Sequence, residues 1–199
     1  MENTTSDGQP TGTYPRSKGV VEIVSRTLWD SLPPRKAEAL PGQRLVVWFS
    51  DTATPECKNF TDCMSTVQEL QIQHMDVLRL PDIKHNFLIG GDGRVYEGRG
   101  FGVKPSNDEY IKKMYPLVED TLDIAYITTL EKGDVPSEIM REATINFLKY
   151  SKYQGHLTLV VHHEVWEWEH TARDILPFMK PDYQPSNSYE REISASKRL

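Results

Sequence analysis

Residues 45–49, Leu-Val-Val-Trp-Phe, form an unbroken apolar run with turn-forming residues on both sides. Such a run is typical of a strand buried on both faces, as when helices cover both sides of a sheet. The segments 85–89 and 94–97 are joined by Gly-Gly-Asp-Gly, which predicts a hairpin. Three further stretches are predicted to be strands: 20–24, 122–127 and 157–162. The pattern is that of an α/β domain.

Other segments carry apolar residues at intervals of three and four, the spacing of an amphipathic helix. The first helix is expected over 62–79, with Thr61 as its N-cap. The second is expected between Pro136, a favourable first residue, and Gly155. A third is expected within 171–180. Strands and helices therefore alternate along the chain.

The length of 199 residues favours one domain with a substantial core. Residues 1–20 and 181–199 are polar and predict a flexible lead-in and a polar tail, which leaves 21–180 for the domain. The net charge of −6 argues against nucleic acid as a partner. No apolar stretch approaches the roughly 20 residues that span a bilayer, and residues 1–5 do not resemble a signal peptide. The chain is either intracellular or a fragment of a longer secreted or membrane-anchored protein.

Cys57 and Cys63 are the only two cysteines. As a disulfide they would close a short loop and contribute about 2 kcal/mol. Their spacing alone is equally consistent with two free thiols. Asn3 and Asn59 each begin a sequon for N-linked glycosylation, which suggests passage through the secretory pathway, although sequons often occur by chance.

The chain resembles the peptidoglycan recognition protein family in three runs: Ser25-Arg26-Thr27-Leu28-Trp29, Trp48 to Cys57, and Gly90 to Gly100. That family shares its fold with zinc amidases that cut bacterial cell-wall peptides. The resemblance covers about 20–180 and implies a central mixed β-sheet flanked by three α-helices. It also implies a Cys57–Cys63 disulfide, because the family carries a cysteine pair at this place. An extracellular protein is then expected, either secreted or the ectodomain of a cell-surface receptor.

The resemblance also places the zinc site of the amidase members. Its three metal ligands fall on Ser50, His162 and His170, and the assisting positions fall on His85 and Trp168. A serine hydroxyl is a poor zinc ligand, so no metal cofactor and no enzymatic activity are expected. Asp51, the next residue, is expected to face the other side of the strand, so it does not replace the missing ligand at Ser50. The histidines can equally be ordinary hydrogen-bonding groups that remain from an ancestral site.

The same cleft binds peptidoglycan fragments in non-catalytic members. The resemblance retains Thr52, Arg99 and Phe101 as candidate groove residues. His85 and Trp168 are also candidates, although the family has a tyrosine and a threonine or lysine at these two positions. After Gly100 the resemblance ends, and 101–121 is longer than the family pattern. Within it, Tyr110, Ile111 and Met114 have helical spacing, and Asp120 stands where an arginine often holds a ligand carboxylate. This segment is a candidate for partner contact or for blocking the groove, or it is harmless surface variation.

Two functions follow from the resemblance. The first is a co-receptor that pairs, as a hetero- or homodimer, with a related recognition domain, which itself carries a muropeptide in some cases. The second is a receptor domain that binds the muropeptide in its own groove. Loss of the zinc ligand is compatible with both. The altered 101–121 segment favours the first.

Overall fold

The computed structural model describes residues 19–40, 46–106, 121–131, 134–153 and 160–163. In this part of the chain a six-stranded sheet has the order β1-β4-β3-β5-β2-β6. Its strands are β1 (Ile23–Val24), β2 (Val46–Asp51), β3 (Phe87–Ile89), β4 (Val95–Glu97), β5 (Thr121–Tyr126) and β6 (Val160–His163). The β3–β4 pair is antiparallel and the other pairs are parallel, so the sheet is mixed. The α/β class, the strands and the hairpin are confirmed.

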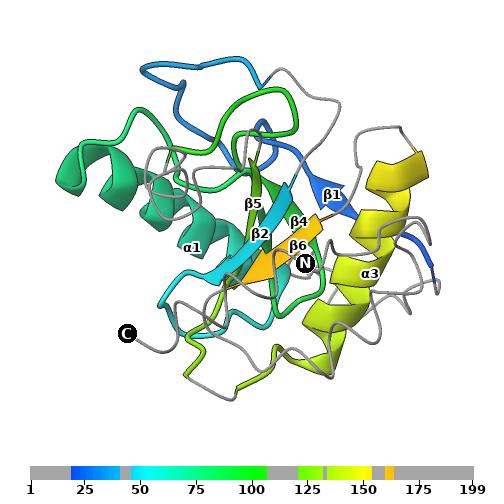
Figure 1. The fold of residues 1–199 in the computed structure, drawn as a ribbon. Helices are drawn as coiled ribbons and strands as arrows, with labels where there is room; N and C mark the ends of the chain where they lie inside the picture. The colour runs from blue at the N-terminus through cyan, green and yellow to red at the C-terminus, as the bar shows by residue number, and fades with distance from the viewer. Residues whose placement is uncertain (1–18, 41–45, 107–120, 132–133, 154–159, 164–199) are drawn as a thin grey trace, which may run out of the picture.

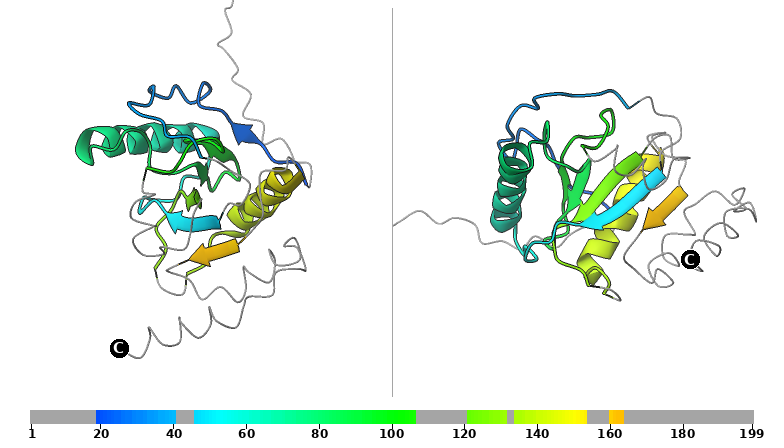
Figure 2. Two further views of the ribbon diagram at one scale, coloured as in Figure 1. Left: turned by 45° about the horizontal axis from the view of Figure 1, so that its top comes forward. Right: turned by 60° about the vertical axis from the view of Figure 1, so that its left-hand side comes forward.

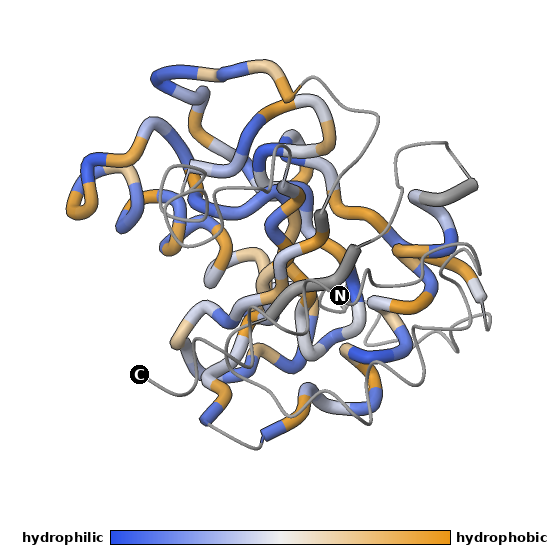
Figure 3. Tube along the Cα trace, in the orientation of Figure 1, coloured by the Kyte–Doolittle hydropathy of each residue, from blue (hydrophilic) through white to orange (hydrophobic). Residues whose placement is uncertain are grey.

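Two α-helices are described, α1 (Phe60–Ile72) and α3 (Glu138–Tyr153), and they lie on opposite sides of the sheet (Figures 1 and 2). A short π-helix, η1 (Gln73–Val77), continues α1. Along both helices the chain alternates between apolar and polar residues (Figure 3), as amphipathic helices do. The predicted helix within 171–180 lies outside the described residues.

The N-cap of α1 is Asn59 and not Thr61, which corrects the sequence prediction. Asn59 has an extended backbone, and its Oδ1 accepts a hydrogen bond from the amide of Asp62 at 3.0 Å. Thr61 is already inside the first turn, where its hydroxyl is past the position that caps the free amides. Both residue types are good caps, so a sequence that offers them two positions apart leaves the start ambiguous.

Alternate residues of β3 face opposite helices, and the core is divided into two clusters. Phe87 and Ile89 of β3 belong to the apolar cluster that includes Met140 and Phe147 of α3. Leu88, between them, belongs to the cluster that includes residues of α1. This alternation is the period of two expected of a sheet covered on both faces. No helix in the described part of the chain is long and apolar enough to cross a membrane.

Candidate functional site

Ser50 and Asp123 meet on the face of the sheet that looks toward α1. Leu122 and Ile124 of β5 pack in the α3 cluster, so Asp123 between them faces the other way. β2 and β5 run parallel with Trp48 opposite Asp123, which brings the end of β2 beside this carboxylate. The hydroxyl of Ser50 donates to Oδ1 of Asp123 at 3.3 Å. Asp123 is fully buried, so this carboxylate depends on protein partners.

His85 supplies the second partner of the carboxylate. Its Nδ1 lies 3.1 Å from Oδ2 of Asp123, and its side chain is almost completely buried. The neighbouring Asn86 fixes this arrangement through two hydrogen bonds to the backbone of Asp123. The backbone N–H of Asn86 donates to the carbonyl of Asp123 at 2.9 Å, and its side-chain Oδ1 accepts from the backbone N–H of Asp123 at 2.9 Å. Both oxygens of the carboxylate are therefore engaged inside the protein.

His74 of η1 extends the cluster. Its ring lies edge-on to that of His85, with 5.8 Å between centroids. The amide of Lys84 donates to its Nδ1 at 3.0 Å. Burial lowers the pKa of His74 to about 4, and its neighbours His85 and Lys84 act in the same direction. His74 is thus a neutral imidazole at pH 7.

Asp51 and Thr52 form a separate set of contacts at the end of β2. The carboxylate of Asp51 accepts from the amide of Ala53 at 2.7 Å, whereas Ser50 is bonded to β5. The two neighbours therefore have different partners, as the alternation of a strand predicts. Thr52 is half-buried, and its hydroxyl lies 2.7 Å from that of Thr54.

Of the three positions that the resemblance assigns to the zinc of the amidases, the structure describes the side chain of one, Ser50. The first ligand position holds Ser50, a neutral hydroxyl that is a poor zinc ligand and already donates to Asp123. No group of three His, Cys, Asp or Glu side chains in the described ranges is arranged to hold a metal ion. The backbone of β6 places His162 in register with Trp48 of β2. The side chain of His162 and the whole of Trp168 and His170 are outside what the structure describes.

The structure places the candidate groove residue Arg99 inside the protein. Its Nε donates to the carbonyl of Lys104 at 2.5 Å, and one terminal nitrogen donates to that of Lys36 at 3.2 Å. The other terminal nitrogen lies 3.6 Å from Asp82. Burial lowers the pKa of Arg99, with Asp82 opposing this effect. Through these contacts Arg99 connects the segments that contain Lys36, Asp82 and Lys104.

Phe101 lies on the opposite side of the sheet from the Ser50–Asp123–His85 cluster. Its ring packs on Phe87 at 4.5 Å and on Phe147 at 5.7 Å between centroids, in the apolar layer under α3. The structure thus brings His85 to Ser50 but separates Phe101 from both. The other candidates of the partner-contact segment, Tyr110, Ile111, Met114 and Asp120, lie outside the described residues.

Sequence reasoning missed Asp123 and His74 as members of this cluster. The signal for Asp123 was a carboxylate inside the otherwise apolar run Leu122–Ile127, since a charge in a buried strand requires partners. The partner itself is 38 residues away and has no local signature. His74 sits on the apolar stripe of its helix, where it is easily taken for a packing residue.

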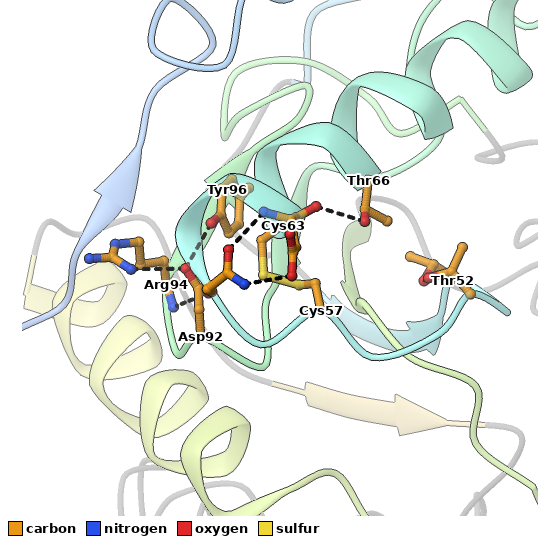
Figure 4. Close-up of a disulfide and its surroundings, with 10 residues drawn as sticks. Thr52, Cys57, Cys63, Thr66, Asp92, Arg94 and Tyr96 are labelled. Carbon is orange, nitrogen blue, oxygen red and sulfur yellow. Dashed lines mark hydrogen bonds and ion pairs between the residues drawn. A yellow bond between two sulfur atoms is a disulfide. The ribbon is translucent and has the colours of Figure 1, made fainter. Parts of the chain in front are cut away.

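The predicted disulfide between Cys57 and Cys63 is confirmed, with 5.0 Å between the Cα atoms (Figure 4). The turn between β3 and β4 packs against it. In that turn Asp92 accepts from the hydroxyl of Tyr96 at 2.8 Å and pairs with Arg94 at 3.0 Å (Figure 4). Burial and the charge of Asp92 raise the pKa of Tyr96 above its usual value.

No family model matches the chain. It is 31% identical to a peptidoglycan recognition protein of Trichoplusia ni over 141 residues, which cover 70% of this chain and 73% of that protein. A peptidoglycan recognition protein of Bombyx mori is 32% identical over 136 residues, covering 68% of this chain and 66% of the relative. The chain spans just under two thirds of the length of several such relatives, 64% for one from Drosophila melanogaster.

Solved structures show the same fold. The ectodomain of the Drosophila transmembrane receptor PGRP-LCa matches with a TM-score of 0.64 at 25% identity, over 82% of this chain and 91% of that one. A chain of the complex between tracheal cytotoxin and the PGRP-LCa and PGRP-LCx ectodomains matches with a TM-score of 0.64 at 28% identity, over 72% of this chain and 84% of that one.

Proposed function

Because the chain belongs to the peptidoglycan recognition protein family, we propose that it is a non-catalytic recognition domain of antibacterial innate immunity. Its role is that of a co-receptor, which pairs with a related recognition domain that carries a muropeptide. The proposal includes an extracellular location, as the ectodomain of a membrane receptor or as a secreted protein. The Cys57–Cys63 disulfide supports that location, since such bonds persist in oxidising compartments.

The observation that carries the non-catalytic part is the state of position 50. In the amidase members a histidine there holds zinc. Here the Ser50 hydroxyl is hydrogen-bonded to Asp123, whose other oxygen meets His85. A hydroxyl does not supply the strong ligand that a catalytic zinc needs in order to activate water. Ser50 and His85 are thus each in hydrogen-bonding contact with the carboxylate of Asp123.

The contacts of two candidate groove residues support pairing with a related domain over direct binding of a muropeptide. The guanidinium of Arg99, a candidate groove residue, is directed to carbonyls and to Asp82 of its own chain. Phe101, a second candidate, packs in the layer beneath α3. Each side chain would have to leave its present partners to meet a sugar or peptide. The solved ectodomain complex of two related domains with tracheal cytotoxin provides a precedent for such pairing.

The alternative is a receptor domain that binds the muropeptide in its own groove. The retained Thr52, just after β2, favours it, because its side chain is only half-buried and its hydroxyl lies 2.7 Å from that of the neighbouring Thr54. Direct binding would place that hydroxyl against the peptide stem.

Titration calorimetry with a monomeric muropeptide separates the two. We expect no measurable heat when the ligand is added to this chain alone, and binding when the chain is added to a related recognition domain preloaded with the ligand. Omitting the muropeptide from that second titration is the control. Binding of free muropeptide to this chain with a micromolar Kd would reject the co-receptor role in favour of the alternative.

A further inference from the structure

The tripeptide Asn59-Phe60-Thr61 matches the acceptor sequence for N-linked glycosylation and lies inside the segment closed by the disulfide. All three residues are exposed, as are Lys58 before them and Asp62 after them. Sequons are frequent by chance, but many fall where the fold leaves no room for a sugar. This one lies on an open stretch of surface at the start of α1.

The hydrogen bonds of Asn59 are compatible with a sugar on its side chain. The cap of α1 uses the amide oxygen, which accepts from the backbone of Asp62 at 3.0 Å. The amide nitrogen, where a sugar attaches, donates only to the exposed carboxylate of Asp62 at 2.5 Å. A glycosylated nitrogen keeps one of its two hydrogens, so even this contact can persist. The modified asparagine therefore still caps the helix.

The disulfide adds an independent observation about the compartment. Cys57 and Cys63, on either side of the sequon, are paired, which requires an oxidising environment. In animal cells that environment is the secretory pathway, where sequons are also glycosylated. The chain that forms this bond is therefore exposed to the transfer reaction as well.

We propose that Asn59 carries an N-linked glycan. The co-reactant is a lipid-pyrophosphate-linked oligosaccharide. Nδ2 of Asn59 forms a bond to the anomeric carbon of the first sugar, while the bond from that carbon to the phosphate oxygen breaks. The lipid pyrophosphate leaves, the amide releases one proton, and nothing is oxidised or reduced. The glycan then covers the disulfide loop and the first turn of α1, which directs any partner domain to other surfaces.

The test is a peptide map of the full chain, secreted from cultured animal cells behind a leader sequence. Trypsin cleaves after Lys58 and Arg79, so one reduced peptide contains Asn59 alone among the two sequons. A peptide N-glycosidase in heavy-oxygen water converts each glycosylated asparagine to a labelled aspartate. We expect the label in most copies of this peptide, in both secreted and cell-retained protein.

The substitution Thr61→Ala is expected to abolish the label, because it removes the hydroxyl that the transfer reaction requires but leaves the cap intact. The matched variant Thr61→Ser should keep it. An unlabelled 59–79 peptide in the parent chain, with the disulfide formed, would overturn the proposal. So would a label that persists in Thr61→Ala. Neither result bears on muropeptide binding, so the proposed function is tested separately.

Discussion

At the scale of single residues, Asp123 determines where Ser50 and His85 lie. It is fully buried, one of its oxygens accepts from Ser50 and the other contacts His85. Breaking a buried pair leaves one group without a partner, which costs more than the pair contributes when intact. The cluster therefore acts as a structural unit within the core.

The substitution Asp123→Asn tests this unit. It removes the charge and one acceptor while it keeps the shape, so we expect the free energy of unfolding to fall by about 2 kcal/mol. Urea unfolding of the oxidised protein measures it. The control is Glu142→Gln on the exposed side of α3, expected to change the free energy by less than about 0.5 kcal/mol. Equal effects of the two variants would show that Asp123 is not held by its partners.

His74 gives the fold a pH dependence with a defined sign. Its pKa is about 4 in the folded protein and 6.5 when unperturbed, so between these values the unfolded chain binds the extra proton. Stability from the neutral imidazole is complete above pH 6.5 and is lost as the pH falls toward 4. The difference amounts to roughly 3 kcal/mol.

The variant His74→Asn isolates this contribution, since its oxygen can accept from the Lys84 amide but does not titrate. We expect its free energy of unfolding to fall less than that of the parent between pH 7 and pH 4.5. Urea unfolding at both values measures the difference. An identical fall in the two proteins would assign the pH dependence to other groups.

At the scale of elements, the turn between β3 and β4 depends on the absence of a side chain at Gly91. A Cβ on Gly91 would lie 2.3 Å from the carbonyl oxygen of Cys57, a backbone atom held by the disulfide loop. The turn and the loop are therefore in direct contact. This contact fastens the start of α1 to the hairpin.

Gly91→Ala is expected to destabilise the fold by roughly 1–3 kcal/mol, because the loop must move to admit the methyl group. The control is Gly102→Ala, where an added Cβ meets nothing within 4 Å and the backbone has no positive φ. Thermal unfolding should give a clearly lower Tm for the first variant than for the second. Similar Tm values would mean that the disulfide loop shifts to admit the methyl group without a loss of stability.

The sequence predicted the elements better than the site. A continuous apolar run predicts a strand such as β2, and the Gly-Gly-Asp-Gly turn predicts the hairpin, because both signals are local in the sequence. The cap of α1 was misplaced by two residues, since Asn59 and Thr61 are both suitable. The Asp123–His85 pair joins two elements, and no local pattern encodes it. The inward orientation of Arg99 likewise depends on loops that are distant in the sequence.

At the scale of the whole molecule, the chain has the fold of its family, and we propose that the chemistry at one position differs. The chain matches solved recognition domains with TM-scores of 0.61 to 0.64. At the end of β2 the hydroxyl of Ser50 donates to Asp123, and we propose that this serine stands where the amidase members have a metal-binding histidine. We therefore propose that the chain recognises peptidoglycan without zinc-dependent hydrolysis.

The most direct test is to equilibrate the purified full chain with micromolar zinc, remove the unbound metal, and measure both zinc content and hydrolysis of a muropeptide. A zinc amidase of the family, treated identically, is the positive control. We expect well under one zinc per chain and no release of peptide above the rate without protein. One zinc bound per chain, together with turnover of the muropeptide, would contradict it.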